Sequence, residues 1–301
     1  MLKKLLPPFL FVVLLGVGWI TVQSYAQRGA VDLVVFSYDR PLQLYAFLES
    51  ADSYLQGVST ISVIYRATDK AYVQGYAKVK KQFPQVTFLQ QSSQPYQDFK
   101  PLVMKASFDS PASYIMYGVD DIVVTDHVDL YQVVSHLEAT KAYGFYLRLG
   151  THIDECYMLQ KQQQIPPLKP VGDGVYSWTF AQAEGDWAYP NTQDMTVYRK
   201  KDIEQTYKRL PFVSPNSCEG QWSSCADMSK QGLCFASAKI VNIPMNLVQT
   251  IYPNNRNMAL FSAHDLLAKF NEGLKMDIRP LYKSHFKSVH VEYVPTFVQR
   301  A

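Results

Sequence analysis

The feature that most constrains the fold is an alternation of short apolar segments with helix-like stretches over residues 31–117. Each apolar segment has four to six residues. The stretches between them repeat their apolar residues every three or four positions, as amphipathic helices do. Strands that are apolar on both faces are typical of parallel sheets covered by helices. The sequence therefore predicts the order β-α-β-α-β-α-β and an α/β fold.

Two segments of this alternation are expected to form a ligand site. In open parallel sheets, ligands bind beyond the carboxyl ends of the strands. Residues 37–41 follow the first predicted strand, and Pro41 suits the first turn of a helix. Residues 118–121 follow the fourth strand. The predicted strands are residues 31–36, 61–65, 86–89 and 114–117, and a helix over residues 101–108 precedes the last of them.

The pattern continues with less regularity after residue 125. Residues 126–140 are predicted to form an amphipathic helix and residues 142–149 a strand. Residues 150–190 show little periodicity and are predicted to be long loops, which tend to hold functional residues on a rigid sheet. Ser262 with Asp265 three residues later resembles a capping box at the start of another helix.

The amino terminus combines Lys3 and Lys4 with the uncharged apolar stretch 5–22. That stretch is intermediate in length between the core of a signal peptide and a full membrane span. An uncleaved anchor would keep the lysines in the cytoplasm and place the rest of the chain on the far side of the membrane. Ser24 and Ala26 form a small-x-small pattern that a signal peptidase could cut, which would give a secreted protein. Both outcomes stay open.

Composition excludes some classes of function. Hydrophobic residues make up 48% and charged residues 18% of the chain, which is typical of a globular protein. The net charge of +3, from 29 basic and 26 acidic residues, argues against nucleic acid as the main partner. Three of the four cysteines are Cys218, Cys225 and Cys234, without the spacing of a zinc site. One or two disulfides and unpaired core cysteines are both compatible with this pattern.

Two adjacent carboxylates, Asp120 and Asp121, end the fourth apolar strand. Such a pair is unfavourable unless another group compensates its charge. A divalent metal bound to a diphosphate would do so, because hard cations prefer carboxylate and phosphate oxygens. The alternative is an aspartate pair that forms a turn and caps the next helix.

Three features together resemble the GT-A type glycosyltransferases, nearest the family-2-like inverting enzymes. They are residues 36–41 (Phe-Ser-Tyr-Asp-Arg-Pro), the α/β alternation, and residues 119–121 (Val-Asp-Asp). The resemblance covers residues 31–125. It implies a Rossmann-like α/β fold with a mixed, mostly parallel sheet flanked by helices and a loop-rich acceptor-binding half. Val119 stands where the family's Asp-x-Asp pattern has its first acid, which leaves metal dependence and activity open.

The resemblance implies a set of residues that bind the nucleotide. Ser37, Tyr38 and Arg40 would lie near the nucleotide itself. Arg66 and Asp69, just after the second strand, would meet the base or ribose. The alternative for these two is a surface ion pair or a loop cap.

The resemblance also implies a metal and a diphosphate beside the fourth strand. Asp121 would bind the metal, Mn²⁺ or Mg²⁺. Asp120 would share that metal site or hydrogen-bond a hydroxyl of the ribose or sugar. His264 is a further, less favoured ligand, because an isolated histidine in a helix is usually structural.

An inverting transfer needs a carboxylate that removes the proton of the acceptor hydroxyl. Glu219, three residues before Trp222, is the first candidate, because the family has an acidic residue at a comparable late position. Asp186, beside Trp187, is the second candidate, and Asp194 follows it. The alternative for each is an exposed loop carboxylate.

These expectations define one function and two alternatives. The main prediction assigns residues 1–27 to an anchor or signal peptide and residues 28–301 to one catalytic domain. Within that domain, residues 28–125 would bind the nucleotide and residues 126–301 the acceptor. The donor would be a nucleotide-diphosphate sugar, with a uridine nucleotide favoured, and the sugar a hexosyl or N-acetylhexosaminyl group. The acceptor would be a glycan, a glycoprotein or a lipid-linked sugar.

The first alternative is a catalytically inactive glycan-binding protein on the same fold. The second is a secreted glycosidase, which would need two carboxylates flanking a sugar cleft. The compartment separates the first alternative from the main prediction, because nucleotide sugars must be supplied where the domain lies.

Overall fold

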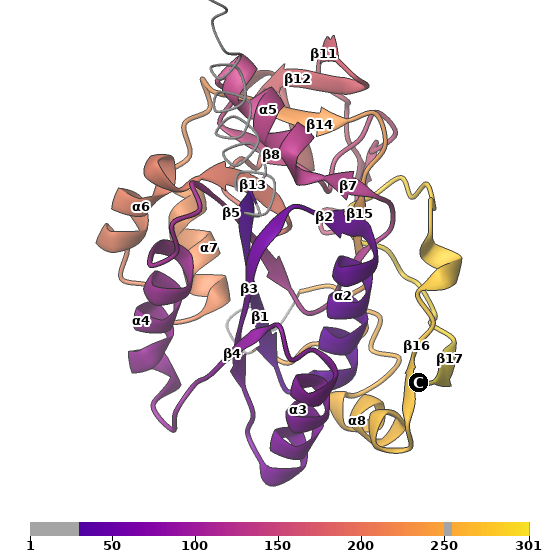
Figure 1. Ribbon diagram of the computed structural model, residues 1–301. Helices are drawn as coiled ribbons and strands as arrows, with labels where there is room; N and C mark the ends of the chain where they lie inside the picture. Colours follow the sequence, from indigo (N-terminus) through magenta and orange to yellow (C-terminus); the bar gives the residue numbers. More distant parts are fainter. Residues whose placement is uncertain (1–29, 250–254, 301) are drawn as a thin grey trace, which may run out of the picture.

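A nine-stranded mixed sheet runs through the molecule with helices against both faces (Figure 1). The computed structural model describes residues 30–249 and 255–300. The segment predicted to be an anchor or signal peptide, residues 1–27, lies outside the described residues. The order of the strands in the sheet is β11-β12-β14-β8-β13-β5-β1-β3-β4.

Within the described part of the chain, no helix is both long enough and apolar enough to cross a bilayer.

The first half of the chain forms the parallel part of the sheet. β1 pairs in parallel with both β3 and β5, and β3 pairs in parallel with β4. The four strands predicted from the apolar segments are therefore confirmed, and their carboxyl ends share one edge. Their bounds are Val31–Tyr38 for β1, Val58–Arg66 for β3, Thr87–Gln90 for β4 and Tyr114–Val119 for β5.

Alternate residues of β1 enter two separate cores. Leu33 and Val35 pack with α2, α3, α5 and α8, whereas Val34 and Phe36 pack with α4, α6 and α7. This is why residues 33–36 of β1 are apolar without interruption rather than alternating with polar residues. The helix bounds are Pro41–Tyr54 (α2), Lys70–Gln82 (α3), Pro95–Phe108 (α4), Leu130–Thr140 (α5), Lys200–Arg209 (α6), Pro215–Ser223 (α7) and Ala263–Asn271 (α8).

The second half of the chain extends the sheet with mostly antiparallel pairs. β13 lies antiparallel between β5 and β8, β14 pairs in parallel with β8, and β12 and β11 add antiparallel strands. The predicted fold class, α/β with a mixed sheet flanked by helices, is confirmed. The bounds are Gly144–Tyr146 (β8), Lys169–Gly172 (β11), Val175–Thr179 (β12), Thr196–Arg199 (β13) and Gln231–Phe235 (β14).

The prediction that residues 150–190 are long loops is partly wrong. β12 lies inside the main sheet, and Trp178 and Trp187 are buried against each other with ring centroids 5.0 Å apart. The sequence pattern misses this strand because the polar Ser177 is buried within it. A strand that buries a polar residue breaks the alternation from which strands are recognised.

Two predicted helix starts are also corrected. α4 begins at Pro95 rather than near Pro101, so that Pro101 lies inside the helix. α5 begins at Leu130, because the Asp129 carboxylate caps it and residue 128 pairs with β2. The remaining elements are β2 (Leu55–Gln56), β6 (Ile122–Val124), β7 (Val128–Asp129), β9 (Glu155–Cys156), β10 (Lys161–Gln162), β15 (Ile240–Asn242), β16 (Leu274–Met276), β17 (Phe297–Gln299) and the 3₁₀ turns η1 (Phe180–Gln182), η2 (Gly185–Ala188) and η3 (Arg279–Leu281).

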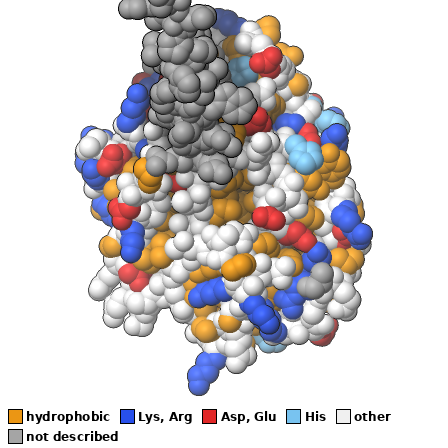
Figure 2. Space-filling model, viewed as in Figure 1, with side chains coloured by type: hydrophobic (Ala, Val, Ile, Leu, Met, Phe, Trp, Pro, Cys, Tyr) orange, Lys and Arg blue, Asp and Glu red, His pale blue; other side chains and the backbone are white. Residues whose placement is uncertain are grey.

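The predicted capping box is confirmed, since Ser262 and Asp265 bond reciprocally at the start of α8. All four cysteines are free thiols, and Cys225 alone of them is exposed. The face in Figure 2 carries basic and acidic side chains interspersed with neutral and apolar ones. This view therefore shows no broad surface of a single charge.

A buried ion pair joins the two halves of the sheet. Lys200 Nζ, at the start of α6, donates to Asp32 Oδ2 of β1 at 2.6 Å. Asp32 is fully buried and also accepts a hydrogen bond from Thr60 at 2.8 Å. A buried carboxylate left without its cation is strongly destabilising.

Replacing this lysine tests the link between the halves. Lys200→Met is expected to lower the free energy of unfolding by roughly 3–5 kcal/mol, because it leaves Asp32 charged and unpaired. Urea denaturation measures the change. Lys201→Met is the matched control, since Lys201 is exposed. Equal effects of the two substitutions would contradict the assigned role.

Candidate functional site

A cavity of about 810 Å³ opens at the carboxyl ends of β1, β3 and β5. Its volume lies in the range typical of ligand sites. It receives residues from both halves of the chain, so that segments far apart in the sequence meet there. The predicted site residues that line it are Ser37, Tyr38, Arg40, Arg66, Asp120, Asp121, Asp186, Asp194 and Glu219.

The turn after β1 is fixed by local hydrogen bonds. Asp39 has a φ of 53°, a left-handed conformation that is uncommon for a residue other than glycine. Its carboxylate stabilises the turn by accepting hydrogen bonds from Thr68 N at 2.9 Å and Thr68 Oγ1 at 2.7 Å. The hydroxyl of Tyr76 accepts from Arg40 N at 3.2 Å and lies 2.6 Å from Ser37 Oγ. The turn therefore holds Arg40 at the edge of the cavity.

Arg40 connects the ends of β1 and β5 to a distant segment. Its Nη1 donates to Asp120 Oδ1 at 2.9 Å and to Asp121 Oδ2 at 3.3 Å. Its Nε donates to Asn246 Oδ1 at 2.8 Å, and its Nη2 donates to the carbonyl oxygen of Asn246. Burial opposes the charge of Arg40, but Asp120 and Asp121 raise its pKa above the ordinary value. The arginine is therefore a permanent buried cation.

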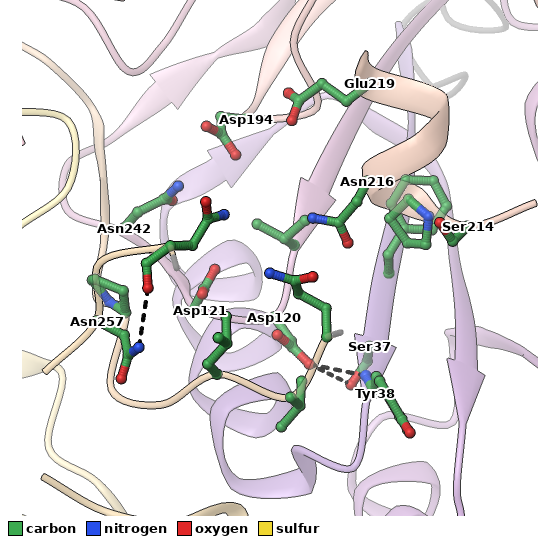
Figure 3. A pocket seen from close by; sticks show the side chains of 18 of the residues that line it. Ser37, Tyr38, Asp120, Asp121, Asp194, Ser214, Asn216, Glu219, Asn242 and Asn257 are labelled. Carbon is green, nitrogen blue, oxygen red and sulfur yellow. Dashed lines mark hydrogen bonds between the residues drawn. The ribbon is translucent and has the colours of Figure 1, made fainter. Parts of the chain in front are cut away.

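Both carboxylate oxygens of Asp120 accept hydrogen bonds from other residues of the chain. Its Oδ2 accepts from Ser37 Oγ at 2.8 Å and from Tyr38 N at 3.2 Å, as Figure 3 shows, and its Oδ1 accepts from Arg40. Burial raises the pKa of this carboxyl to about 6 and Arg40 opposes the rise, so Asp120 is ionised at neutral pH. Asp120 thus ties β5 to the turn after β1. Its contact with a metal or with a hydroxyl of the ribose or sugar stays a prediction.

The carboxylates fit a divalent cation poorly. Asp121 is the partly exposed member of the pair, with 18% of its side chain accessible, and Arg40 already contacts it. Within residues 30–249 and 255–300, no three His, Cys, Asp or Glu side chains are grouped so as to hold a metal. His264 lies on α8 and is not one of the residues that line the cavity. Asp121 is therefore the single carboxylate at this edge with room for a cation, whereas Mg²⁺ and Mn²⁺ sites use several oxygens.

Asp186 is also paired with an arginine. Arg148 is 2% exposed and donates from Nη1 to Asp186 Oδ1 at 3.4 Å. Its Nη2 donates to the carbonyl oxygens of Asp186 at 3.0 Å and Tyr189 at 3.1 Å. Gln163 Nε2 donates to the other carboxylate oxygen at 3.2 Å. These contacts fix the η2 segment at the cavity wall, and the catalytic role of Asp186 stays a prediction.

Glu219 and Asp194 are carboxylates without such a partner: the described residues place neither in an ion pair. Figure 3 shows the Glu219 carboxylate, on α7, pointing toward Asp194, which lies just before β13. Gln193 N donates to Glu219 Oε1 at 2.8 Å. Burial, and then the charge of Asp194, raise the pKa of Glu219 to about 7. A carboxylate with such a pKa suits proton transfer at neutral pH.

The wall of the cavity at the carboxyl ends of β1 and β3 carries an aromatic and a basic side chain. The Arg66 guanidinium lies 4.9 Å from the centre of the Tyr38 ring, and both residues line the cavity. Asp69 does not line it. Its carboxylate caps α3, accepting from Ala71 N at 2.8 Å and Tyr72 N at 3.1 Å. Of the roles considered for Asp69, the structure shows a cap, at the start of α3, and the contact with the base or ribose stays a prediction.

The polar cavity residues that the sequence did not predict include Arg148, Asn242, Asn246 and His290. Arg148 could have been predicted from the sequence, because a charged residue near the end of an apolar strand indicates a site. Asn242 is the last residue of β15 and Asn246 lies in the irregular segment that follows it, and no sequence pattern marks either residue as part of a site. His290 contacts Asn242, with 3.0 Å between Nε2 and Nδ2.

The fold and the cavity define an α/β domain with an acidic, arginine-bridged site at the carboxyl edge of its parallel strands. No protein-family model matches the chain. The chain is similar to the bifunctional glycosyltransferase pgtA of Dictyostelium discoideum, with 24% identity over 203 residues. The match covers 59% of this chain and 25% of pgtA, so the chain spans about a quarter of that relative. The predicted resemblance to glycosyltransferases is confirmed by this similarity.

Two solved structures with lower sequence identity are also similar to this chain. The S. aureus TarS 1–349 structure in complex with UDP gives a TM-score of 0.46 at 9% identity, covering 68% of this chain and 57% of that one. The mannosyltransferase PcManGT from Pyrobaculum calidifontis, in complex with GDP-Man and Mn²⁺, gives a TM-score of 0.38 at 7% identity, covering 72% and 61%.

The carboxylate pair can be tested without any ligand. Asp194→Asn is expected to lower the pKa of Glu219 from about 7, because it removes the negative charge that helps to raise it. Carbon-detected NMR titration of labelled glutamate side chains measures the midpoint. Asp202→Asn, on α6 outside the cavity, is the control. An unchanged or higher midpoint in Asp194→Asn would show that the two carboxylates do not interact.

Proposed function

We propose that this chain is a glycosyltransferase that moves a sugar from a nucleotide-diphosphate donor to a hydroxyl group of an acceptor, with inversion. The observation that carries the proposal is the shared cavity. The residues predicted after the first and fourth strands line it together with Glu219, a carboxylate whose pKa is raised to about 7. The similarity to pgtA supports the same class of enzyme.

The donor side of the proposed site is the edge formed by β1, β3 and β5. Tyr38 and Arg66 would meet the nucleoside, which offers a flat ring and hydroxyl groups. Arg40 would lie beside the diphosphate, because guanidinium groups suit phosphate oxygens. A uridine nucleotide is the first donor to test, and the sugar would be a hexosyl or N-acetylhexosaminyl group.

The proposed chemistry uses the charges already present. Glu219, in its ionised form, takes the proton of the acceptor hydroxyl as the oxygen attacks the anomeric carbon. The bond from that carbon to the diphosphate oxygen breaks on the opposite face, and the diphosphate leaves with the electron pair. Arg40 would stabilise the negative charge that develops there. The Mn²⁺ or Mg²⁺ expected from the resemblance is given no step, because Asp121 alone is left to hold it.

The acceptor and the location complete the proposal. The acceptor would be a glycan, a glycoprotein or a lipid-linked sugar. Residues 1–27 would anchor the chain with its amino terminus in the cytoplasm and the domain on the far side, or would be removed as a signal peptide before secretion.

A specific observation favours a second candidate, a glycan-binding protein without activity. Asp120 and Asp186, two of the carboxylates predicted to act in the site, are both occupied by arginines. An inactive descendant of a transferase could retain such a cavity for sugar binding alone. Donor binding separates the two candidates.

Calorimetric titration of the full chain in detergent with UDP is the first test. The transferase proposal expects saturable binding, weakened about tenfold in Arg66→Ala, because that change removes a cationic contact worth ~1.4 kcal/mol. Arg209→Ala, an exposed arginine of α6, is the control and should bind as the parent does. If neither UDP nor GDP binds, the glycan-binding candidate is preferred.

Replacing the proposed base tests the chemistry separately from binding. Glu219→Gln is expected to reduce the transfer rate by roughly 10²–10⁴-fold while UDP affinity stays unchanged, because the amide cannot accept the proton. The rate is measured as UDP released with a panel of acceptors. Glu204→Gln, on α6, is the matched control. A Glu219→Gln variant with full activity would exclude this residue as the base.

A further inference from the structure

We infer that Arg40 takes the place of a divalent cation at this site, so that a nucleoside diphosphate binds there without metal. The inference rests on the proposed function, since it concerns the donor side of the same cavity. It departs from the metal use that the resemblance implied. It is carried by the contacts of Arg40, Asp120, Asp121 and Asn246.

The first step is the position of the arginine nitrogen. One atom, Arg40 Nη1, contacts both carboxylates, at 2.9 Å from Asp120 Oδ1 and 3.3 Å from Asp121 Oδ2. A cation bridging the two carboxylates would need the place that Nη1 already fills. Asp120 has no oxygen to spare, because Ser37 and Tyr38 donate to its other oxygen.

The second step is charge. Two carboxylates carry a charge of −2, and Arg40 reduces the sum to −1 inside the protein. Arg40 is 8% exposed, so water screens this interaction weakly. A divalent cation would therefore meet a site whose negative charge is half neutralised and would lie beside a fixed positive group. The chain thus supplies its own cation at the point where Asp120 and Asp121 require one.

The third step is that Arg40 cannot easily move aside. Its Nε and Nη2 are held by the side-chain and main-chain oxygens of Asn246. Together with the two contacts of Nη1, four of its five N–H groups are used. The left-handed Asp39 fixes the backbone just before it. A cation that displaced Arg40 would have to break this whole set of hydrogen bonds.

The fourth step concerns the N–H donors of the site that have no hydrogen-bond partner in the part of the chain that the structure describes and could therefore bind an anion. One N–H of Arg40 Nη2 has no partner among the described residues. Asn246 Nδ2 is likewise buried and unpartnered within residues 30–249 and 255–300. Both side chains line the cavity. A charged and a neutral N–H donor on two residues that are hydrogen-bonded to each other suit the oxygens of a diphosphate. The ligand class inferred for this part of the cavity is therefore a diphosphate.

The experiment is a UDP titration of the full chain in detergent, once with EDTA and once with Mn²⁺. The inference expects the two dissociation constants to agree within about twofold, because the charge is supplied by the protein. Arg40→Gln is expected to weaken binding in EDTA by about tenfold or more, since it removes a charge-assisted contact.

A ligand-free measurement covers the case in which Arg40→Gln binds nothing. Mn²⁺ alone should leave the melting temperature of the parent unchanged. It should raise that of Arg40→Gln, because the freed carboxylates then lack a cation. Arg66→Gln is the matched control, as an arginine of the same cavity that stacks on Tyr38, and it should respond to Mn²⁺ as the parent does. If Arg40→Gln does not fold, Asn246→Ala is the second variant, expected to weaken UDP binding in EDTA while keeping both carboxylates paired.

The outcomes separate the inference from the proposed function. Equal UDP binding in EDTA and Mn²⁺ supports both. UDP binding that requires Mn²⁺, with a parent melting temperature raised by Mn²⁺, overturns the inference and leaves the transferase proposal standing. An absence of nucleotide binding under both conditions overturns the two together.

Discussion

The ion pair between Arg40 and Asp120 is the interaction on which the rest of the site depends. It joins the turn after β1 to the end of β5, and through Asn246 it brings in a segment from the other half of the chain. Asp120 could not be buried at the end of an apolar strand without this cation and the hydrogen bond from Ser37. The shape of the cavity and the place of Asp121 at its wall both follow from that arrangement.

The carboxylates of the cavity fall into two groups, according to whether a buried arginine compensates their charge. Asp120 and Asp186 each have a buried arginine and therefore act as structural anchors. Asp194 and Glu219 lie near each other, and the described residues place neither in an ion pair. Burial, and then the charge of Asp194, raise the pKa of Glu219 to about 7. The carboxylate that lacks a cation is the one suited to take a proton.

Much of the parallel half could be predicted from the sequence, because strands apolar on both faces leave a clear pattern. The residues after β1 and β5 followed from the rule that ligands bind at carboxyl ends. The role of Asp120 could not be predicted, since its partner Arg40 meets it only once the strands pair. Asn246 could not be found either, because nothing in an irregular segment marks which backbone oxygen will hold an arginine. β12 was missed because it buries the polar Ser177.

The central claim is that this cavity binds a nucleotide-diphosphate sugar, and a crystal structure of the chain grown with UDP tests it most directly. The account predicts density for the diphosphate beside Arg40 and Asn246, with the nucleoside against Tyr38 and Arg66. Density for UDP at another surface, or a cavity that stays empty at saturating UDP, would contradict it.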